Sequence, residues 1–254
     1  MSGHSHWATV KHKKGATDAK KGKVFSKMAK AITLAARQGG PDPDMNLRLK
    51  YAMEKARQVN MPKDNIERAI KKGAGETEGP GLEERIYEGY GPGGVAIIVQ
   101  TLSDNRNRTA AEIRKIFETR GGRMGEVGCV SWMFQMKGLF AVDASRTSED
   151  DLIAITLEAG VEDISRTDGS YELVCDPADF QKVRQALAEA AVATQVAELG
   201  QVPKQRIDLD PVEGKKVMAL VEELEDHEDV QNVYTNFDFT EELLSEVAKA
   251  MEKA

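Results

Sequence analysis

The first third of the chain shows a helical period of apolar and charged positions. Between Thr17 and Arg37 the two sets gather on opposite sides of a helix, at about 100° per residue, and Gly39-Gly40-Pro41 ends it. The apolar positions are Phe25, Met28, Ala29, Ile32 and Ala36, and the cations are Lys20, Lys23, Lys27, Lys30 and Arg37. One face of this helix therefore suits a protein core, and the other suits an anionic partner.

Two more short helices follow at the same period. One runs from Asn46 to Val59, and one starts at Asn60-Met61-Pro62 and ends at Gly73; Asn near the cap and Pro in the first turn are typical of helix starts. Three short helices with short connections predict a small helical domain. The glycine-rich stretch from Gly73 to Gly81 has the composition of a linker.

Beyond the linker the period changes to that of strands. The run Val95 to Val99 is short and β-branched, which suits a buried strand. The polar residues Asp104 to Thr109 then offer caps to a helix that Gly121-Gly122 closes, and Val130 to Phe134 is interpreted as another strand. The predicted order of this part is strand, helix, strand.

From Lys137 the pattern begins afresh and gives β-α-β-β-α-β, the ferredoxin-like order. The strands are expected at 139–142, 161–165, 171–175 and within 196–209, and the helices at 148–158 and 178–191. A helix at 212–226 and a strand at 230–239 then complete the earlier strand-helix-strand. The sequence predicts an α+β fold with three domains: the helical domain 1–76, an α/β domain made of 77–135 and 206–254, and a ferredoxin-like α/β domain 136–205 inserted in it.

Charge is divided unevenly between these parts. Residues 1–75 carry 17 Lys and Arg against 6 Asp and Glu, net +11, so the remainder carries 18 against 36, net −18. The whole-chain value of −7 hides this division. A basic segment of this kind is the electrostatic footprint of a protein that binds a phosphate backbone. The predicted nucleic-acid-binding residues are Lys11, His12, Lys13, Lys14, Lys20, Lys23, Lys27, Lys30 and Arg37.

The sequence offers no constellation typical of an enzyme. Three of the four histidines lie in residues 1–15, and the fourth, His227, ends an acidic helix, so no catalytic triad can be assembled. Cys129 and Cys175 share no spacing typical of zinc ligands. The glycines from Gly89 to Gly94 precede a strand, whereas a phosphate loop precedes a helix. We expect no catalytic residue, no metal, no cofactor and no small-molecule substrate.

Location follows from two further observations. The chain has no run of about 18 apolar residues that could span a bilayer. Its first residues carry Lys and His where a secretory signal has an apolar core. We expect a cytoplasmic protein without a membrane partner.

Several long stretches of this sequence resemble the YebC/PmpR family, which includes the mitochondrial translational activator of cytochrome c oxidase. They read GHSHWATVKHKKGATDAKKGKVFSKMAKAIT, NMPKDNIERAIKKGAGE, YEGYGPGGVAIIVQTLSDNRNRTAAEIRKIF and GCVSWMFQMKG. The resemblance implies a non-enzymatic protein of three domains. Some family members are described as DNA-binding transcriptional regulators, and others as ribosome-associated translation factors that help with stretches such as consecutive prolines. This sequence departs from the family pattern at Leu47, where Pro is usual.

Two functions stay open at this point. The first is a DNA-binding transcriptional regulator whose basic helix and arm neutralise duplex phosphates, although no helix pair with base-reading side chains stands out. The alternative is a ribosome-associated translation factor that binds ribosomal RNA and relieves stalling at sequences such as polyproline. A stacking platform for single strands is not expected in either case, because the first 75 residues hold few aromatics, namely Trp7, Phe25 and Tyr51.

Overall fold

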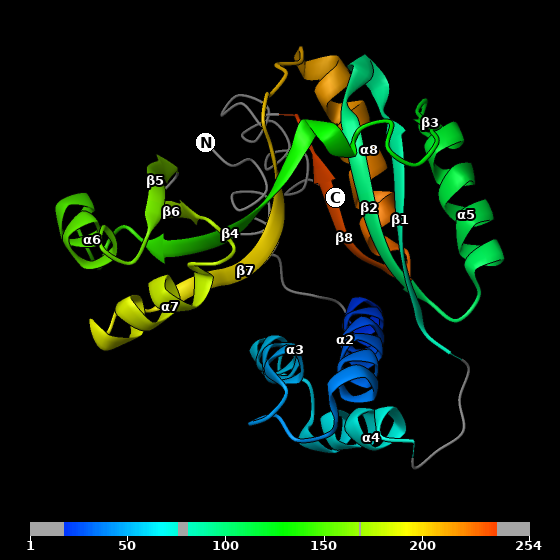
Figure 1. Ribbon diagram of the computed structural model, residues 1–254. Coiled ribbons are helices and arrows are strands. Elements are labelled where there is room, and N and C mark those ends of the chain that lie inside the picture. Colours follow the sequence, from blue (N-terminus) through cyan, green and yellow to red (C-terminus); the bar gives the residue numbers. More distant parts are fainter. Residues whose placement is uncertain (1–17, 76–80, 168, 238–254) are drawn as a thin grey trace.

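Between residues 18 and 75 the chain forms three helices, which lie on one side of two β-sheets (Figure 1). The computed structural model describes residues 18–75, 81–167 and 169–237. The helices are α2 (Asp18–Gly39), α3 (Leu47–Gln58) and α4 (Lys63–Gly73). Their buried core consists of Ile32, Ala35, Ala36, Leu49, Ala56, Met61, Ile66 and Ala69. The apolar stripe predicted for the first helix is thus the face that packs on α3 and α4.

Asn46 fixes the turn between α2 and α3. Its side chain accepts a hydrogen bond from the Leu49 N–H at 3.1 Å, as an N-cap residue does. Its amide group also donates to the carbonyls of Ala35 and Gly40, at 2.8 Å each. The second helix begins at Leu47 under this cap, so in this chain Leu occupies the first helical position.

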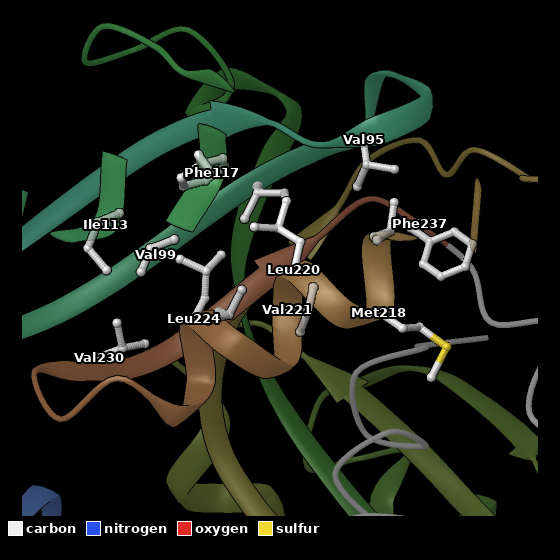
Figure 2. Packing of buried hydrophobic residues seen from close by; sticks show 13 residues of the cluster. Val95, Val99, Ile113, Phe117, Met218, Leu220, Val221, Leu224, Val230 and Phe237 are labelled. Carbon is white, nitrogen blue, oxygen red and sulfur yellow. The ribbon is translucent and has the colours of Figure 1, made fainter. Parts of the chain in front are cut away.

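The first sheet contains four antiparallel strands in the order β3-β1-β2-β8. Its strands are β1 (Glu83–Tyr90), β2 (Ala96–Ser103), β3 (Arg123–Met124) and β8 (Val230–Thr235). Helices α5 (Arg106–Thr119) and α8 (Pro211–Asp226) contribute to the core on one face of this sheet. Figure 2 shows this core, in which Leu220, Val221 and Leu224 of α8 lie against Val99 of β2 and Phe117 of α5.

Strand β2 is buried on both faces, which explains its unbroken apolar run. Ile97 and Val99 point into the core with the helices. Ala96 and Ile98 belong to a second cluster with Val130, Phe134 and Tyr234 on the other face. Side chains of a strand alternate between the two faces of a sheet, so a strand that is covered on both sides favours successive apolar residues, as from Val95 to Val99.

The second sheet also contains four antiparallel strands, in the order β5-β6-β4-β7. The chain order is β4 (Phe134–Asp143), α6 (Glu149–Thr156), β5 (Val161–Thr167), β6 (Ser170–Cys175), α7 (Phe180–Glu189) and β7 (Thr194–Pro203). This arrangement is the ferredoxin-like fold, inserted between the strands of the first sheet. The predicted α+β class is therefore confirmed, and the residue bounds of the three domains stay a prediction.

Two details of the first sheet differ from the sequence-based expectation. The predicted strand from Val130 to Phe134 is wrong: Ser131–Met133 form a 3₁₀ turn, and the strand that starts at Phe134 belongs to the second sheet. The partner of β1 is instead the two-residue strand β3. Strand β1 itself was not predicted, because its first half is charged and exposed.

The Glu88 carboxylate accounts for the turn. This side chain of β1 is buried and accepts hydrogen bonds from the N–H groups of Gly128, Val130 and Ser131, each at 2.8 Å. These backbone donors are therefore not available to a strand ladder. Burial by itself would raise the pKa of Glu88, but the three N–H donors outweigh it and hold the pKa below its ordinary value.

We expect Glu88→Gln to lower the free energy of unfolding by about 1.5–3 kcal/mol at pH 7, because the charge-assisted bonds to three N–H groups are lost. Urea unfolding followed by circular dichroism measures this difference. Since the folded pKa lies below the unfolded one, the advantage of the wild type is complete above the unfolded pKa and shrinks as the pH falls from 7 toward 3. Glu83→Gln, at an exposed position of the same strand, is the matched control. An equal loss in both variants would contradict this account of the turn.

Candidate nucleic-acid interface

The nine predicted nucleic-acid-binding residues fall into different groups in the structure. Four of them, Lys11, His12, Lys13 and Lys14, lie outside the described residues. Lys20 lies in α2, but its side chain is also outside the described part of the structure. Arg37 is exposed in the last turn of α2. Lys23, Lys27 and Lys30, which we call the lysine face, contact another domain.

The lysine face lies against the C-terminal end of α8 and the turn that follows it. Its ammonium groups donate to backbone carbonyls: Lys23 to Asp226 at 3.2 Å, Lys27 to Glu225, and Lys30 to Glu228 at 3.4 Å. The last carbonyls of a helix have no partner within the helix, and they form the negative end of its dipole. The lysine face therefore caps α8 from a neighbouring domain.

Beside this cap lies Asp229, a fully buried carboxylate. Its Oδ1 lies 2.5 Å from Lys30 Nζ, and its side chain has no exposed surface. Its Oδ2 accepts from Arg108 Nη2 at 2.8 Å, Thr109 Oγ1 at 2.7 Å and Ser103 Oγ at 3.0 Å. Burial by itself would raise the pKa of Asp229, but the hydrogen bonds from Lys30, Thr109 and Arg108 outweigh it, so the pKa lies far below its ordinary value. Asp229 is thus an anion throughout the physiological range.

Helix α5 is oriented by its own cap toward Asp229. Asn105 accepts a hydrogen bond from the Arg108 N–H at 3.1 Å, which starts the helix so that Arg108 and Thr109 lie in its first turn. The sequence interpretation assigned the stretch from Asp104 to Thr109 to capping alone. Asp229 was missed altogether, since it is more than 100 residues away from its partners on α5 and nothing local marks it.

Glu112, His227 and Asp229 meet at the same place and have the side-chain types of metal ligands. The His227 ring nitrogen Nε2 lies 2.8 Å from Glu112 Oε2, and its Nδ1 accepts from the Asp229 N–H at 3.1 Å. Both oxygens of Asp229, however, already hold donors, and two of these donors are the cations Lys30 and Arg108. A metal cation there would be repelled by them, so the donor set fits an ion-pair network.

The two cysteines offer no reactive thiolate. Burial raises the pKa of the Cys175 thiol to about 11. Burial, with the nearby Glu88 carboxylate, also raises the pKa of Cys129. A cysteine needs a lowered pKa to act as a nucleophile near neutral pH, so neither is suited to such a role.

The helical domain has a second contact, with the inserted domain. Glu54 pairs with Arg184 of α7 at 2.5 Å, and Lys55 pairs with Glu198 of β7 at 2.5 Å. The Tyr51 ring meets Phe180 edge to face, with ring centroids 6.3 Å apart, and the Arg184 guanidinium lies 4.7 Å from the centre of the Tyr51 ring. The helical domain is therefore held against both α/β domains.

Other cations of the helical domain are exposed and were not among the predicted residues: Lys50, Arg57, Lys71 and Lys72. The last two lie in the final turn of α4. Gly73 brings this turn against α2, since an added Cβ would lie 2.4 Å from the Thr33 carbonyl oxygen and 3.2 Å from the Arg37 nitrogen. The last turns of α2 and α4 thus carry three exposed cations, Arg37, Lys71 and Lys72, next to the close contact of the two helices.

We expect Asp229→Asn to lower the free energy of unfolding by about 3–5 kcal/mol, because it leaves Lys30 and Arg108 without their buried partner. Differential scanning calorimetry or urea unfolding would measure the loss. Glu228→Gln removes the neighbouring charge at a side chain that is 58% exposed, and should cost at most about 1 kcal/mol. If the two variants are equally stable, Asp229 is not the structural centre of this contact.

Comparison with known proteins identifies two families in the chain. The family described as the TACO1/YebC protein N-terminal domain matches residues 5–76. The family described as the TACO1/YebC second and third domain matches residues 82–237. A protein of Natranaerobius thermophilus named "Probable transcriptional regulatory protein" is 51% identical over 96% of this chain and 99% of its own length. A protein of Halothermothrix orenii with the same name is 50% identical over 98% of this chain and 100% of its own length.

A solved structure shows the same fold. The crystal structure of a conserved hypothetical protein from Aquifex aeolicus superimposes with a TM-score of 0.85 at 44% sequence identity, and the match covers 94% of this chain and 99% of that one. The family matches, the relatives and the solved structure each extend over most of the sequence. The chain therefore belongs to the TACO1/YebC family.

Proposed function

We propose that this protein is a non-enzymatic regulator of transcription whose helical domain binds duplex DNA through its phosphates. The observation that carries the proposal is the division of charge, net +11 in residues 1–75 against net −18 in the rest. Relatives at about half identity are named probable transcriptional regulatory proteins. A regulatory role fits these names better than catalysis.

The spacing of the cations on α2 suits a phosphate backbone. Lys23, Lys27, Lys30 and Arg37 are distributed along 15 residues, a distance of about 21 Å from first to last in a helix. The predicted arm residues from Lys11 to Lys14 would add further cations to the phosphate contacts. Such contacts position a protein on nucleic acid without reading its sequence.

Ribosomal RNA is the second candidate partner. It is a candidate because the predicted contacts are cations and not base-reading amide side chains, and phosphate contacts of this kind also serve in the recognition of double-stranded RNA. In that case the protein would be a ribosome-associated translation factor that relieves stalling at difficult sequences such as polyproline. Both functions place it in the cytoplasm, and in the described residues no helix is long and apolar enough to cross a membrane.

We expect the affinity of the full chain for a 20-base-pair DNA duplex to fall steeply with salt, by about 0.9 in log K per log salt for each phosphate neutralised. Replacing Lys23, Lys27 and Lys30 together by Gln should reduce that slope by about 2 to 3. Fluorescence anisotropy with a labelled duplex, titrated at several salt concentrations, measures both quantities. Arg114, Lys115 and Lys182, three exposed cations outside the helical domain, changed together to Gln, serve as the matched control. An unchanged salt slope in the first variant would contradict the assignment of phosphate contacts to the lysine face.

The choice between the two partners needs a separate measurement. If the physiological target is ribosomal RNA, we expect the protein to co-sediment with ribosomes on a sucrose gradient and to be released by high salt. If the target is DNA, we expect it at the top of the gradient and at promoters in a footprinting experiment. Co-sedimentation without any promoter footprint would overturn the transcriptional assignment in favour of translation.

A further inference from the structure

We propose that the C-terminal end of α8, together with Asp229, is a built-in competitor of nucleic acid for the lysine face. In this closed arrangement the protein masks its own phosphate-binding surface, and nucleic acid binds after the helical domain is released. The inference rests on the proposed function, since it concerns the accessibility of the same surface. Its chemistry is that of an anion mimic: backbone carbonyls and one carboxylate stand where phosphate oxygens would.

The lysine face is already bonded to acceptors of the chain itself; Lys27 and Lys30 are partly buried, whereas Lys23 is exposed and lines an open cleft with Asp226 and His227. The acceptors are the carbonyls of Glu225, Asp226 and Glu228 and the Asp229 carboxylate. The Lys30 side chain is only 19% exposed and its charge is already neutralised by Asp229. A phosphate backbone is too bulky to reach this ammonium group while α8 stays in place. Binding through Lys30 therefore requires the two domains to separate.

Separation of the two domains would cost little free energy at Asp229. When Lys30 withdraws, only Oδ1 loses its ion-pair partner, because Arg108, Thr109 and Ser103 belong to the same domain as Asp229 and keep their bonds to Oδ2. An uncompensated buried charge would make a contact permanent. Here the charge stays compensated on the side that remains, so the contact can open and close.

The second contact has the same reversible character. The pairs Glu54–Arg184 and Lys55–Glu198 are partly exposed, and exposed ion pairs contribute little to stability. The aromatic part is the edge-to-face contact of Tyr51 with Phe180. Polar interfaces between domains of one chain ordinarily permit relative motion. A further contact of the helical domain, the ion pair of Arg48 with Glu84 of β1, is about half exposed, so it too contributes little to stability.

The closed state lowers the apparent affinity for nucleic acid. A protein whose binding-competent form is a fraction of the total binds with an affinity reduced by that fraction. A change that weakens the closed state without altering the lysine face must therefore raise the affinity. The second contact offers such a change, since Glu54 and Glu198 contact neither the lysine face nor Asp229 in their ion pairs.

The test uses the full chain and a labelled 20-base-pair DNA duplex as the probe. In the double variant Glu54→Gln with Glu198→Gln, we expect a larger radius of gyration in small-angle X-ray scattering and a duplex affinity about tenfold higher than that of the wild type. The control is Glu118→Gln with Glu158→Gln, which removes two exposed negative charges elsewhere and should change neither quantity. Adding Lys23→Gln, Lys27→Gln and Lys30→Gln to the opened variant should abolish the gain.

The outcomes separate this inference from the proposed function. If the double variant opens but binds the duplex no more tightly, while loss of the lysine face still weakens binding, the masking is refuted and the DNA assignment stands. If loss of the lysine face changes nothing in either background, the binding surface lies elsewhere and both are refuted. If the control pair gains affinity equally, the effect is one of net charge, and the masking is again refuted.

Discussion

The buried carboxylate of Asp229 is the interaction on which the arrangement of the domains depends. It lies in the turn between α8 and β8 and gathers donors from β2, from α5 and from the helical domain. The Leu102 N–H also donates to the Asp229 carbonyl at 2.7 Å, so the backbone at this point is tied to the sheet. A charge removed from water needs several good partners to be tolerated. Lys30 supplies one of these partners, and this ion pair holds α2 against the end of α8 in the closed arrangement.

In this geometry the division of charge along the chain has two effects. It gives the helical domain a surface suited to polyanions, and it also lets that surface dock on the acidic part of its own chain. At the end of α8 the helix dipole adds to the attraction of the acidic side chains. A basic face in a sequence therefore indicates affinity for anions in general. The structure shows which anionic groups this face contacts.

The sequence predicts well what local periodicity controls. Helices α2 and α8 and the ferredoxin-like order follow from apolar spacing, since each buries one continuous stripe or strand face. It fails where a partner distant in the sequence decides the conformation. The stretch from Val130 to Phe134 is apolar enough for a strand, yet the Glu88 carboxylate takes its N–H groups and bends it into a turn. The lysine face was correctly placed on one side of α2, but its contacts with α8 depend on Asp229, about 200 residues away, for which no local pattern exists.

The inserted ferredoxin-like domain accounts for most of the sequence separation between Asp229 and its partners on β2 and α5. Strand β8 completes the first sheet beside β2, so Asp229 meets Ser103 and Thr109 across more than 100 residues, which include the inserted ferredoxin-like domain. Contacts of such long sequence separation carry a loop-closure cost. The docking site for the helical domain is therefore assembled from segments that are far apart in the sequence. Because Asp229 directly precedes β8, the pairing of β8 with β2 positions the carboxylate that Lys30 contacts.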